Sequence, residues 1–286
     1  MKVWDREKNI IYEEKEYGKK KLEFLYNNFF GRILLKLVFT TRWFSNIQAL
    51  YQKSRFSKKK ISNFIKKYNI NMKYYGNIEQ YNSFSDFFKR KRNILNKSDN
   101  NELVSIADSK LQYYEITEDL KLKIKNSIYS LEELVDDKEI AQKFQNGICL
   151  VYRLAMDDYH RYMFLDKGKV ISSKYIKGTL HTIRPISSKY NTFTRNSRNI
   201  TILNTKNFGQ VIQIEVGAML VGKIVNYEKD TFDKLEEKGF FDFGGSTIVQ
   251  LFEKNIVDID KDIVEKSREN IETKVTIGMK IGYKRR

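Results

Sequence analysis

The sequence is poor in the residues that form cross-links and that transfer protons near neutral pH. It contains one cysteine, one proline and two histidines in 286 residues. A single cysteine excludes an internal disulfide and leaves no cysteine and histidine spacing that would hold zinc. Cys149 lies in an apolar run, so we interpret it as a buried core residue, and a chain with so little cysteine is typical of a reducing cytoplasm.

The sequence also lacks a long apolar run. The first ten residues, MKVWDREKNI, contain no apolar segment of the kind that marks a protein for secretion. The most apolar stretch, Leu22–Tyr51, is interrupted by Arg32, Lys36 and Arg42, so no window of about 18 residues is free of charge. Its apolar residues recur at helical spacing, which favours an amphipathic helix in a membrane surface over a spanning helix.

Acidic residues are scarce in the first third of the chain. Residues 1–100 carry 23 Lys or Arg and 9 Asp or Glu, whereas residues 101–286 carry 30 and 27. Composition alone leaves three interpretations of this basic region open. It is a surface for anionic lipid, a nucleic-acid surface on which Tyr and Phe stack against bases, or a helix packed on its own domain with a solvated basic face.

The hydrophobic pattern changes near residue 100. Residues 1–100 have mostly helical patterns, and a polar stretch at 93–102 marks the junction. We therefore predict an α+β fold, with a helical, basic region at 1–100 packed on a β-rich domain at 101–286, which also contains one helix near Leu131–Phe144. The expected strands include Ile148–Leu154, Val170–Tyr175, Val211–Val216, Met219–Val225, Thr247–Phe252 and Lys274–Ile277.

Two segments carry side chains suited to catalysis. His160 lies in DDYHRY, directly after an apolar run, which is either an acid/base site at a strand end or a surface loop with a salt bridge. Ser246 follows two glycines in FGGST, where its hydroxyl can reach the preceding carbonyl, unless the glycines only form a turn into a strand. Spacing alone does not single out Asp108, and His181 is the other imidazole.

Several segments, in the right order, resemble the phosphatidylserine decarboxylase family. DYHR and FGGST match that family's motifs most specifically. The resemblance extends from about Phe84 to Gly282 and, more loosely, over the helical region that precedes Phe84. The matching segments are FSDFFKR at 84–90, IADS at 106–109, DYHR at 158–161, HTIRP at 181–185, EVGA through VGKI at 215–224, and GFFDFGGST at 239–247.

The resemblance implies that the protein is made as a proenzyme and cuts itself. Ser246 would attack the carbonyl of Gly245, giving a β chain, 1–245, and an α chain, 246–286, which remain together as a heterodimer. The α chain would begin with a pyruvoyl group made from Ser246. That covalent cofactor would form a Schiff base with the amine of phosphatidylserine and release CO2 and phosphatidylethanolamine, without a metal or a separate coenzyme. Further dimerisation is left open.

The resemblance also assigns the catalytic side chains. Asp108, His160 and Ser246 would form an Asp–His–Ser arrangement for self-cleavage, and His160 would be the acid in the decarboxylation. Many family members have a second histidine three residues after the first, where this chain has Met163. We therefore expect His160 to serve both steps, with His181 as the alternative for one of them.

The resemblance suggests a role for the basic region at residues 1–100, because a diacyl substrate must be drawn from a bilayer. We expect a peripheral protein on the cytoplasmic face of the cell membrane, attached to anionic lipid and not to nucleic acid. The alternative is a relative that has lost its maturation and acts as a lipid-binding or a basic nucleic-acid-binding protein.

Overall fold

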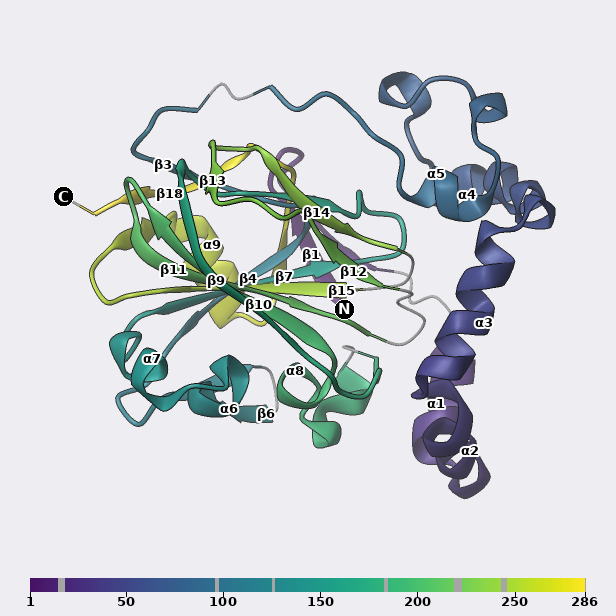
Figure 1. The fold of residues 1–286 in the computed structure, drawn as a ribbon, viewed down its shortest axis with the longest axis horizontal. Helices are drawn as coiled ribbons and strands as arrows, with labels where there is room; N and C mark the ends of the chain where they lie inside the picture. Colours follow the sequence, from purple (N-terminus) through teal and green to yellow (C-terminus); the bar gives the residue numbers. More distant parts are fainter. Residues whose placement is uncertain are drawn as a thin grey trace.

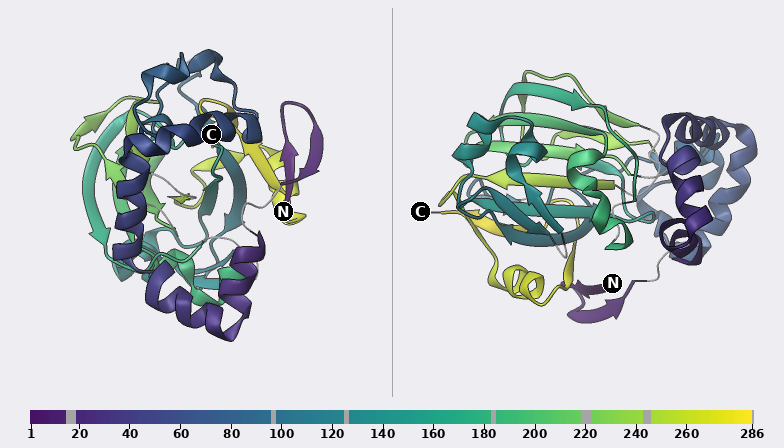
Figure 2. Two further views of the ribbon diagram at one scale, coloured as in Figure 1. Left: turned by 90° about the vertical axis from the view of Figure 1, so that its right-hand side faces the viewer. Right: turned by 90° about the horizontal axis from the view of Figure 1, so that it is seen from below.

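The computed structural model describes residues 1–14, 19–95, 98–124, 127–182, 185–218, 223–242 and 246–285. Figure 1 shows a β-rich body and, at its right, a helical arm, which we define as residues 19–88. The arm lies across one end of the body in both views of Figure 2. The predicted α+β class is confirmed, because a large sheet and a separate set of helices make up the molecule.

A ten-stranded sheet forms the body. Every strand pair in it is antiparallel except β1 with β17, and the central strand β15 is buried at every residue. Across the sheet, the order is β13 (Thr231–Phe232), β9 (Gly168–Ile176), β10 (Arg198–Thr205), β11 (Gly209–Val216), β15 (Ser246–Phe252), β7 (Ile148–Leu154), β4 (Ser109–Glu115), β17 (Glu272–Val275), β1 (Lys2–Asp5) and β2 (Ile10–Glu13).

Alternating side chains on this sheet produce two hydrophobic cores. Along β15, Ile248 and Phe252 enter one core, whereas Val249 and Leu251 enter the other. The first core is covered by β12 (Ile224–Asn226), β14 (Glu237–Phe241), β8 (Arg161–Met163), β16 (Val257–Ile259), β18 (Lys280–Lys284), β3 (Glu102–Val104) and α9 (Lys261–Arg268). The second is covered by β5 (Lys121–Ile124), β6 (Ser127–Ser130), α6 (Leu131–Val135), α7 (Lys138–Lys143) and α8 (Thr192–Arg195).

The arm is a series of short helices. Its first break is at Asn28, whose side chain accepts hydrogen bonds from the N–H groups of Phe30 and Gly31 at 3.0 and 3.3 Å and so begins a new helix. No helix in the described ranges has the length and apolar character needed to cross a bilayer. The arm contains α1 (Lys19–Asn27), α2 (Phe29–Leu34), the π-helix η1 (Leu35–Phe39), α3 (Arg42–Lys53), η2 (Arg55–Lys59), α4 (Lys60–Tyr68), η3 (Met72–Tyr74), η4 (Ile78–Gln80) and α5 (Phe84–Phe88).

Two sequence expectations differ from the structure in detail. The first residues form β1 and β2, not helix, because β1 pairs with β17 at the edge of the main sheet. The helix expected over Leu131–Phe144 is divided into α6 and α7. Asp136 ends α6 with a left-handed conformation (φ 57°), and the Asp137 side chain accepts from the Ile140 N–H at 2.9 Å to begin α7.

Candidate active site

Ser246 lies at the end of the main sheet that faces the arm. It is the first residue of β15 and pairs with Leu154, the last residue of β7. The Ser246 side chain is fully buried, and its hydroxyl has no hydrogen-bond partner among the described residues. Leaving a buried polar group unpaired costs about 1–3 kcal/mol, so this hydroxyl is held in an unfavourable environment for a purely structural serine.

His160 is placed by the turn that follows β7. Its Nδ1 lies 3.0 Å from the carbonyl oxygen of Asp158, and its ring packs against Phe88 of the arm at a centroid distance of 4.2 Å. Because a carbonyl oxygen only accepts hydrogen bonds, Nδ1 carries the proton of the neutral ring and Nε2 is its basic nitrogen. The site therefore presents an imidazole in the tautomer that a general base requires.

The segment that leads to Ser246 is hydrogen-bonded to His160. The Phe241 N–H at the end of β14 donates to the His160 carbonyl at 3.0 Å, and the chain then continues to Ser246. Gly245, the other residue of the predicted cleavage site, lies with Phe243 and Gly244 outside the described residues.

Asp108 is hydrogen-bonded to residues other than His160 and Ser246, its predicted partners. Its Oδ1 accepts hydrogen bonds from Arg92 Nη2 at 2.6 Å and from the Ile277 N–H at 2.9 Å. Within the described residues, no hydrogen bond joins it to His160 or Ser246. The link to His160 is indirect, since the Arg92 N–H donates to the Tyr159 hydroxyl at 3.1 Å.

Met163 occupies the position of the second family histidine and lies in an apolar environment. It is buried with Tyr75, Val104, Tyr159 and Leu235. Its N–H donates to the carbonyl of Ile106, so β8 is held against the segment that leads to Asp108. A thioether packed in this way offers no proton-transfer group.

His181 lies at a joint between the arm and the body. Tyr26 of α1 receives a hydrogen bond from the Thr182 N–H at 3.0 Å, and its hydroxyl lies 3.2 Å from His181 Nδ1, while Tyr190 stacks on the ring at 4.3 Å. Burial and the nearby Arg195 lower the pKa of His181 to about 4. The imidazole is therefore neutral at pH 7 and binds the arm.

Asp242 forms a second joint, which the sequence did not indicate. This buried carboxylate accepts from Ser85 Oγ at 3.0 Å and lies 3.2 Å from the Lys53 ammonium and 3.7 Å from that of Lys89. The three partners all belong to the arm or its end, and Asp242 lies four residues before Ser246. The sequence shows an acidic residue, Asp242, close to the FGGST motif. Its partners depend on the tertiary structure, so this contact could not be predicted.

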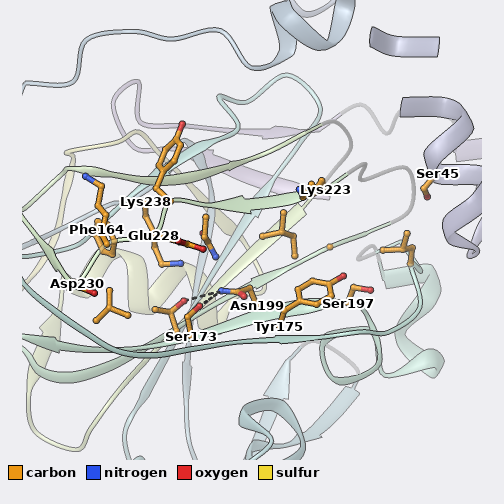
Figure 3. Close-up of a pocket in the computed structure, with 18 of the residues that line it drawn as sticks. Ser45, Phe164, Ser173, Tyr175, Ser197, Asn199, Lys223, Glu228, Asp230 and Lys238 are labelled. Carbon is orange, nitrogen blue, oxygen red and sulfur yellow. Dashed lines mark hydrogen bonds between the residues drawn. The ribbon is translucent and has the colours of Figure 1, made fainter. Parts of the chain in front are cut away.

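A cavity of about 910 Å³ lies between the arm and the inner face of the main sheet (Figure 3). Its walls come from β9, β10, β12 and β14, with Ser45 and Asn46 of α3 at the arm. At its inner wall, the buried Lys238 ammonium lies 2.9 and 3.0 Å from the two carboxylate oxygens of Glu215. The lining combines polar side chains with the apolar Phe164, Leu180 and Ile224, so the cavity offers both hydrogen-bonding groups and apolar surface.

Known proteins are similar to this chain over nearly its whole length. The family model described as phosphatidylserine decarboxylase matches residues 81–283. A "Phosphatidylserine decarboxylase proenzyme 2" of Clostridium acetobutylicum is 50% identical, over 98% of this chain and 97% of the relative. Proenzymes of the same name from Clostridium kluyveri and Fusobacterium nucleatum are each 39% identical, over 99% and 97% of this chain and 99% and 96% of the relatives. The chain belongs to the phosphatidylserine decarboxylase family, a family of carboxy-lyases.

Proposed function

We propose that this enzyme converts phosphatidylserine to phosphatidylethanolamine and CO2 after cutting itself between Gly245 and Ser246. The observation that carries the proposal is the buried Ser246 hydroxyl at the head of β15, which has no hydrogen-bond partner among the described residues. The relatives' printed names, which describe phosphatidylserine decarboxylase proenzymes, agree with a chain that is processed before it acts.

The proposed maturation begins with the Ser246 hydroxyl. Its oxygen adds to the carbonyl carbon of Gly245, the C–N bond breaks, and the amine of residue 246 leaves with the hydroxyl's proton. Elimination then removes the Cα proton of residue 246 and breaks its Cβ–O bond, so Gly245 keeps a carboxylate and residue 246 becomes an enamine. Tautomerisation and the addition of one water molecule release ammonia and leave a pyruvoyl group.

The surroundings of Ser246 fit this group. A pyruvoyl group is close to serine in size and has no hydroxyl donor, so maturation removes the donor that has no partner. Leu154 opposite and Ile248 on the same strand face are buried and apolar, which limits access of water. Once formed, the group supplies a carbonyl that accepts the electron pair left by the departing carboxylate.

We assign the proton transfers to His160. With its Nδ1–H donated to the Asp158 carbonyl, the ring has Nε2 as its basic nitrogen, which would accept the Ser246 proton in maturation and deliver a proton to the substrate carbon after CO2 leaves. Asp108 remains part of this proposal as a positioning residue, because it binds Arg92, which in turn binds Tyr159 beside His160. The Tyr26 contact of His181 favours a structural role for that histidine.

The strand order supports two chains that stay together after the cut. β15, which would begin the α chain, lies between β7 and β11 of the β chain and forms a continuous antiparallel ladder with each. β17 of the α chain lies between β4, with which it pairs antiparallel, and β1, with which it pairs parallel. Separating the chains would break these ladders and both cores, so we propose a stable heterodimer.

We also propose that the arm attaches the enzyme to the membrane surface. Many of its large apolar side chains are exposed on α1 to α3 and η2, and an exposed apolar face of this size marks an interaction surface. The basic surplus of residues 1–100 adds attraction to anionic lipid. The exposed apolar residues are Phe24, Phe29, Phe30, Ile33, Leu34, Leu37, Trp43, Ile47, Leu50, Tyr51 and Phe56.

Release of CO2 from carboxyl-labelled phosphatidylserine in mixed micelles tests the proposal. Ser246→Ala should remain uncut and lose activity to background, because no pyruvoyl group can form. Thr247→Val is the matched control: Thr247 is also buried, and its hydroxyl also has no described partner, but it points to the opposite face of β15. Full activity in Ser246→Ala, or equal loss in both variants, would contradict the proposal.

A further inference from the structure

We propose that Lys223 and Ser45 bind the phosphate of the substrate's headgroup at the arm end of the cavity. The inference depends on the proposed function for the identity of the lipid and for the chemistry at Ser246. It adds the site that would hold the phosphodiester while the serine amine of the same headgroup reaches residue 246.

The strand register places Ser246 on the cavity side of the main sheet. Asn199, which lines the cavity, is paired with Glu215, and Glu215 is paired with Ile248. Directly paired residues of antiparallel strands point to the same face, and residues two apart on one strand do so too. Ser246 therefore shares the face of Ile248, Glu215 and Asn199, so a ligand in the cavity lies on the reactive side of the sheet.

Lys223 is the cavity lysine whose charge is not neutralised by a described carboxylate. Of the other two lysines on the walls, Lys229 pairs with Glu236 and Lys238 pairs with Glu215. The carbonyl of Lys223 accepts the Asp242 N–H at 2.9 Å, so Lys223 lies beside the chain that leads to Ser246. In Figure 3, it lies between Lys238 and Ser45 along the cavity.

Ser45 is the second donor at this end of the cavity. The side chain is only 2% exposed, and its hydroxyl has no hydrogen-bond partner among the described residues. It lies on the inner side of α3, whereas Trp43, Ile47 and Leu50 of the same helix are exposed. A buried hydroxyl that lines a cavity and has no described partner is typical of a position where a ligand oxygen completes the hydrogen bonding.

The two groups suit a phosphodiester. Such a phosphate carries one negative charge and oxygens that only accept hydrogen bonds, which match an ammonium and a hydroxyl donor. α3 then separates two environments: its apolar side faces the lipid chains, and its Ser45 side faces the headgroup.

Binding measurements on the uncut Ser246→Ala protein test this site without requiring catalysis. Three soluble probes are titrated by calorimetry: glycerophosphoserine, glycerophosphoethanolamine and serine. Lys223→Ala should raise the Kd of both phosphodiesters about tenfold or more and leave that of serine unchanged, as expected for the loss of one charge-assisted hydrogen bond. Ser45→Ala should raise the same two constants by about threefold to tenfold. Lys223→Arg should restore most of the binding.

Lys229→Ala is the matched control, because this lysine lines the same cavity but is paired with Glu236. It should change the three constants by less than about twofold. Weakening of serine and glycerophosphoserine by Lys223→Ala, with glycerophosphoethanolamine unchanged, would assign Lys223 to the carboxylate and overturn the inference. No weakening, or no binding of either phosphodiester to the parent protein, would exclude the phosphate site.

The outcome for this site is separable from that for the proposed function. With Ser246 present, Lys223→Ala should still be cut into two chains, as seen by intact mass, because a headgroup contact is not needed for maturation. An uncut Lys223→Ala chain beside a cut parent would place Lys223 in maturation and overturn the inference. An uncut parent whose probes still depend on Lys223 would contradict the proposed function and leave the phosphate site supported.

Discussion

The β body and the helical arm place their apolar side chains in opposite ways. In the body, apolar residues alternate into two cores, and β15 is buried along its whole length. Among the described residues of α1 to α3, few large apolar side chains are buried, among them Leu25 and Tyr26. By contrast, Phe30 and Leu50 are 73% and 70% exposed. The body is therefore stabilised by its own packing, whereas the arm leaves large apolar side chains exposed, which is typical of an interaction surface.

The joints between these two parts are polar and lie next to the site. One is the Tyr26–His181 contact, and the other is the Asp242 carboxylate with Ser85 and Lys53. Phe88, at the end of the arm, packs on His160 itself. We propose a division of labour between the two parts, with the chemistry in the body and the lipid contact on the arm.

The largest effect on self-cleavage and turnover is expected from a substitution of His160, which lies in the body. His160→Ala should slow self-cleavage and lower CO2 release by about 10²- to 10⁴-fold, the usual contribution of a positioned acid or base. Both are measured on the same preparation, by intact mass and by labelled-substrate turnover, and vesicle binding should not change. A larger loss in His181→Ala than in His160→Ala would move the acid/base role to His181.

A smaller, purely membrane effect is expected from the arm. Leu50→Asp should weaken sedimentation with phosphatidylserine vesicles by about tenfold or more, because burying a leucine side chain contributes about 1.5–3 kcal/mol. Turnover of a short-chain substrate below its micelle concentration should stay within about twofold, since the catalytic groups lie in the body. Ile171→Asp, at an exposed position of β9, is the control and should bind vesicles normally. If both variants bind vesicles equally, the proposal that the arm anchors the protein to the membrane is wrong.

An effect on stability, and not on catalysis or vesicle binding, is expected at the contact between Tyr26 of the arm and His181 of the body. The folded-state pKa of His181, about 4, is below the ordinary value of 6.5. The unfolded chain therefore binds the proton at higher pH, and the stabilisation is fully present above pH 6.5 and is lost as the pH falls from 6.5 to 4. We expect about 2 kcal/mol of this loss in the free energy of unfolding, a value reduced for the partial exposure of the ring. Urea unfolding of wild type and His181→Phe should show it as a difference between their pH profiles, and parallel profiles would contradict it.

Much of the candidate site could be proposed from the sequence because the residues to which we assign the chemistry lie in short local motifs. Ser246 and His160 were found in FGGST and DYHR, and the structure adds the buried hydroxyl and the tautomer that these letters do not encode. The partners of Asp108 could not be predicted, because Arg92 and Ile277 reach it from distant parts of the chain. Only the family pattern suggested a bond from Asp108 to histidine.

The fold shows the same limit. Strands such as β7 and β15 were predicted because an apolar run is visible locally. β1 was missed, since its pairing with β17 joins residues that are about 270 positions apart. Ser45 and Lys223 were also missed as site residues, because helical spacing and a basic composition explain each of them without the cavity that they line.

The most direct test of the account is the intact mass of the purified wild-type protein under denaturing conditions. The account predicts two chains, 1–245 and 246–286, with the smaller lighter by one ammonia than a peptide that begins with serine. That result would establish both the cut and the conversion of Ser246. A single uncut chain that nevertheless decarboxylates phosphatidylserine, or a smaller chain that still begins with serine, would contradict the central claim.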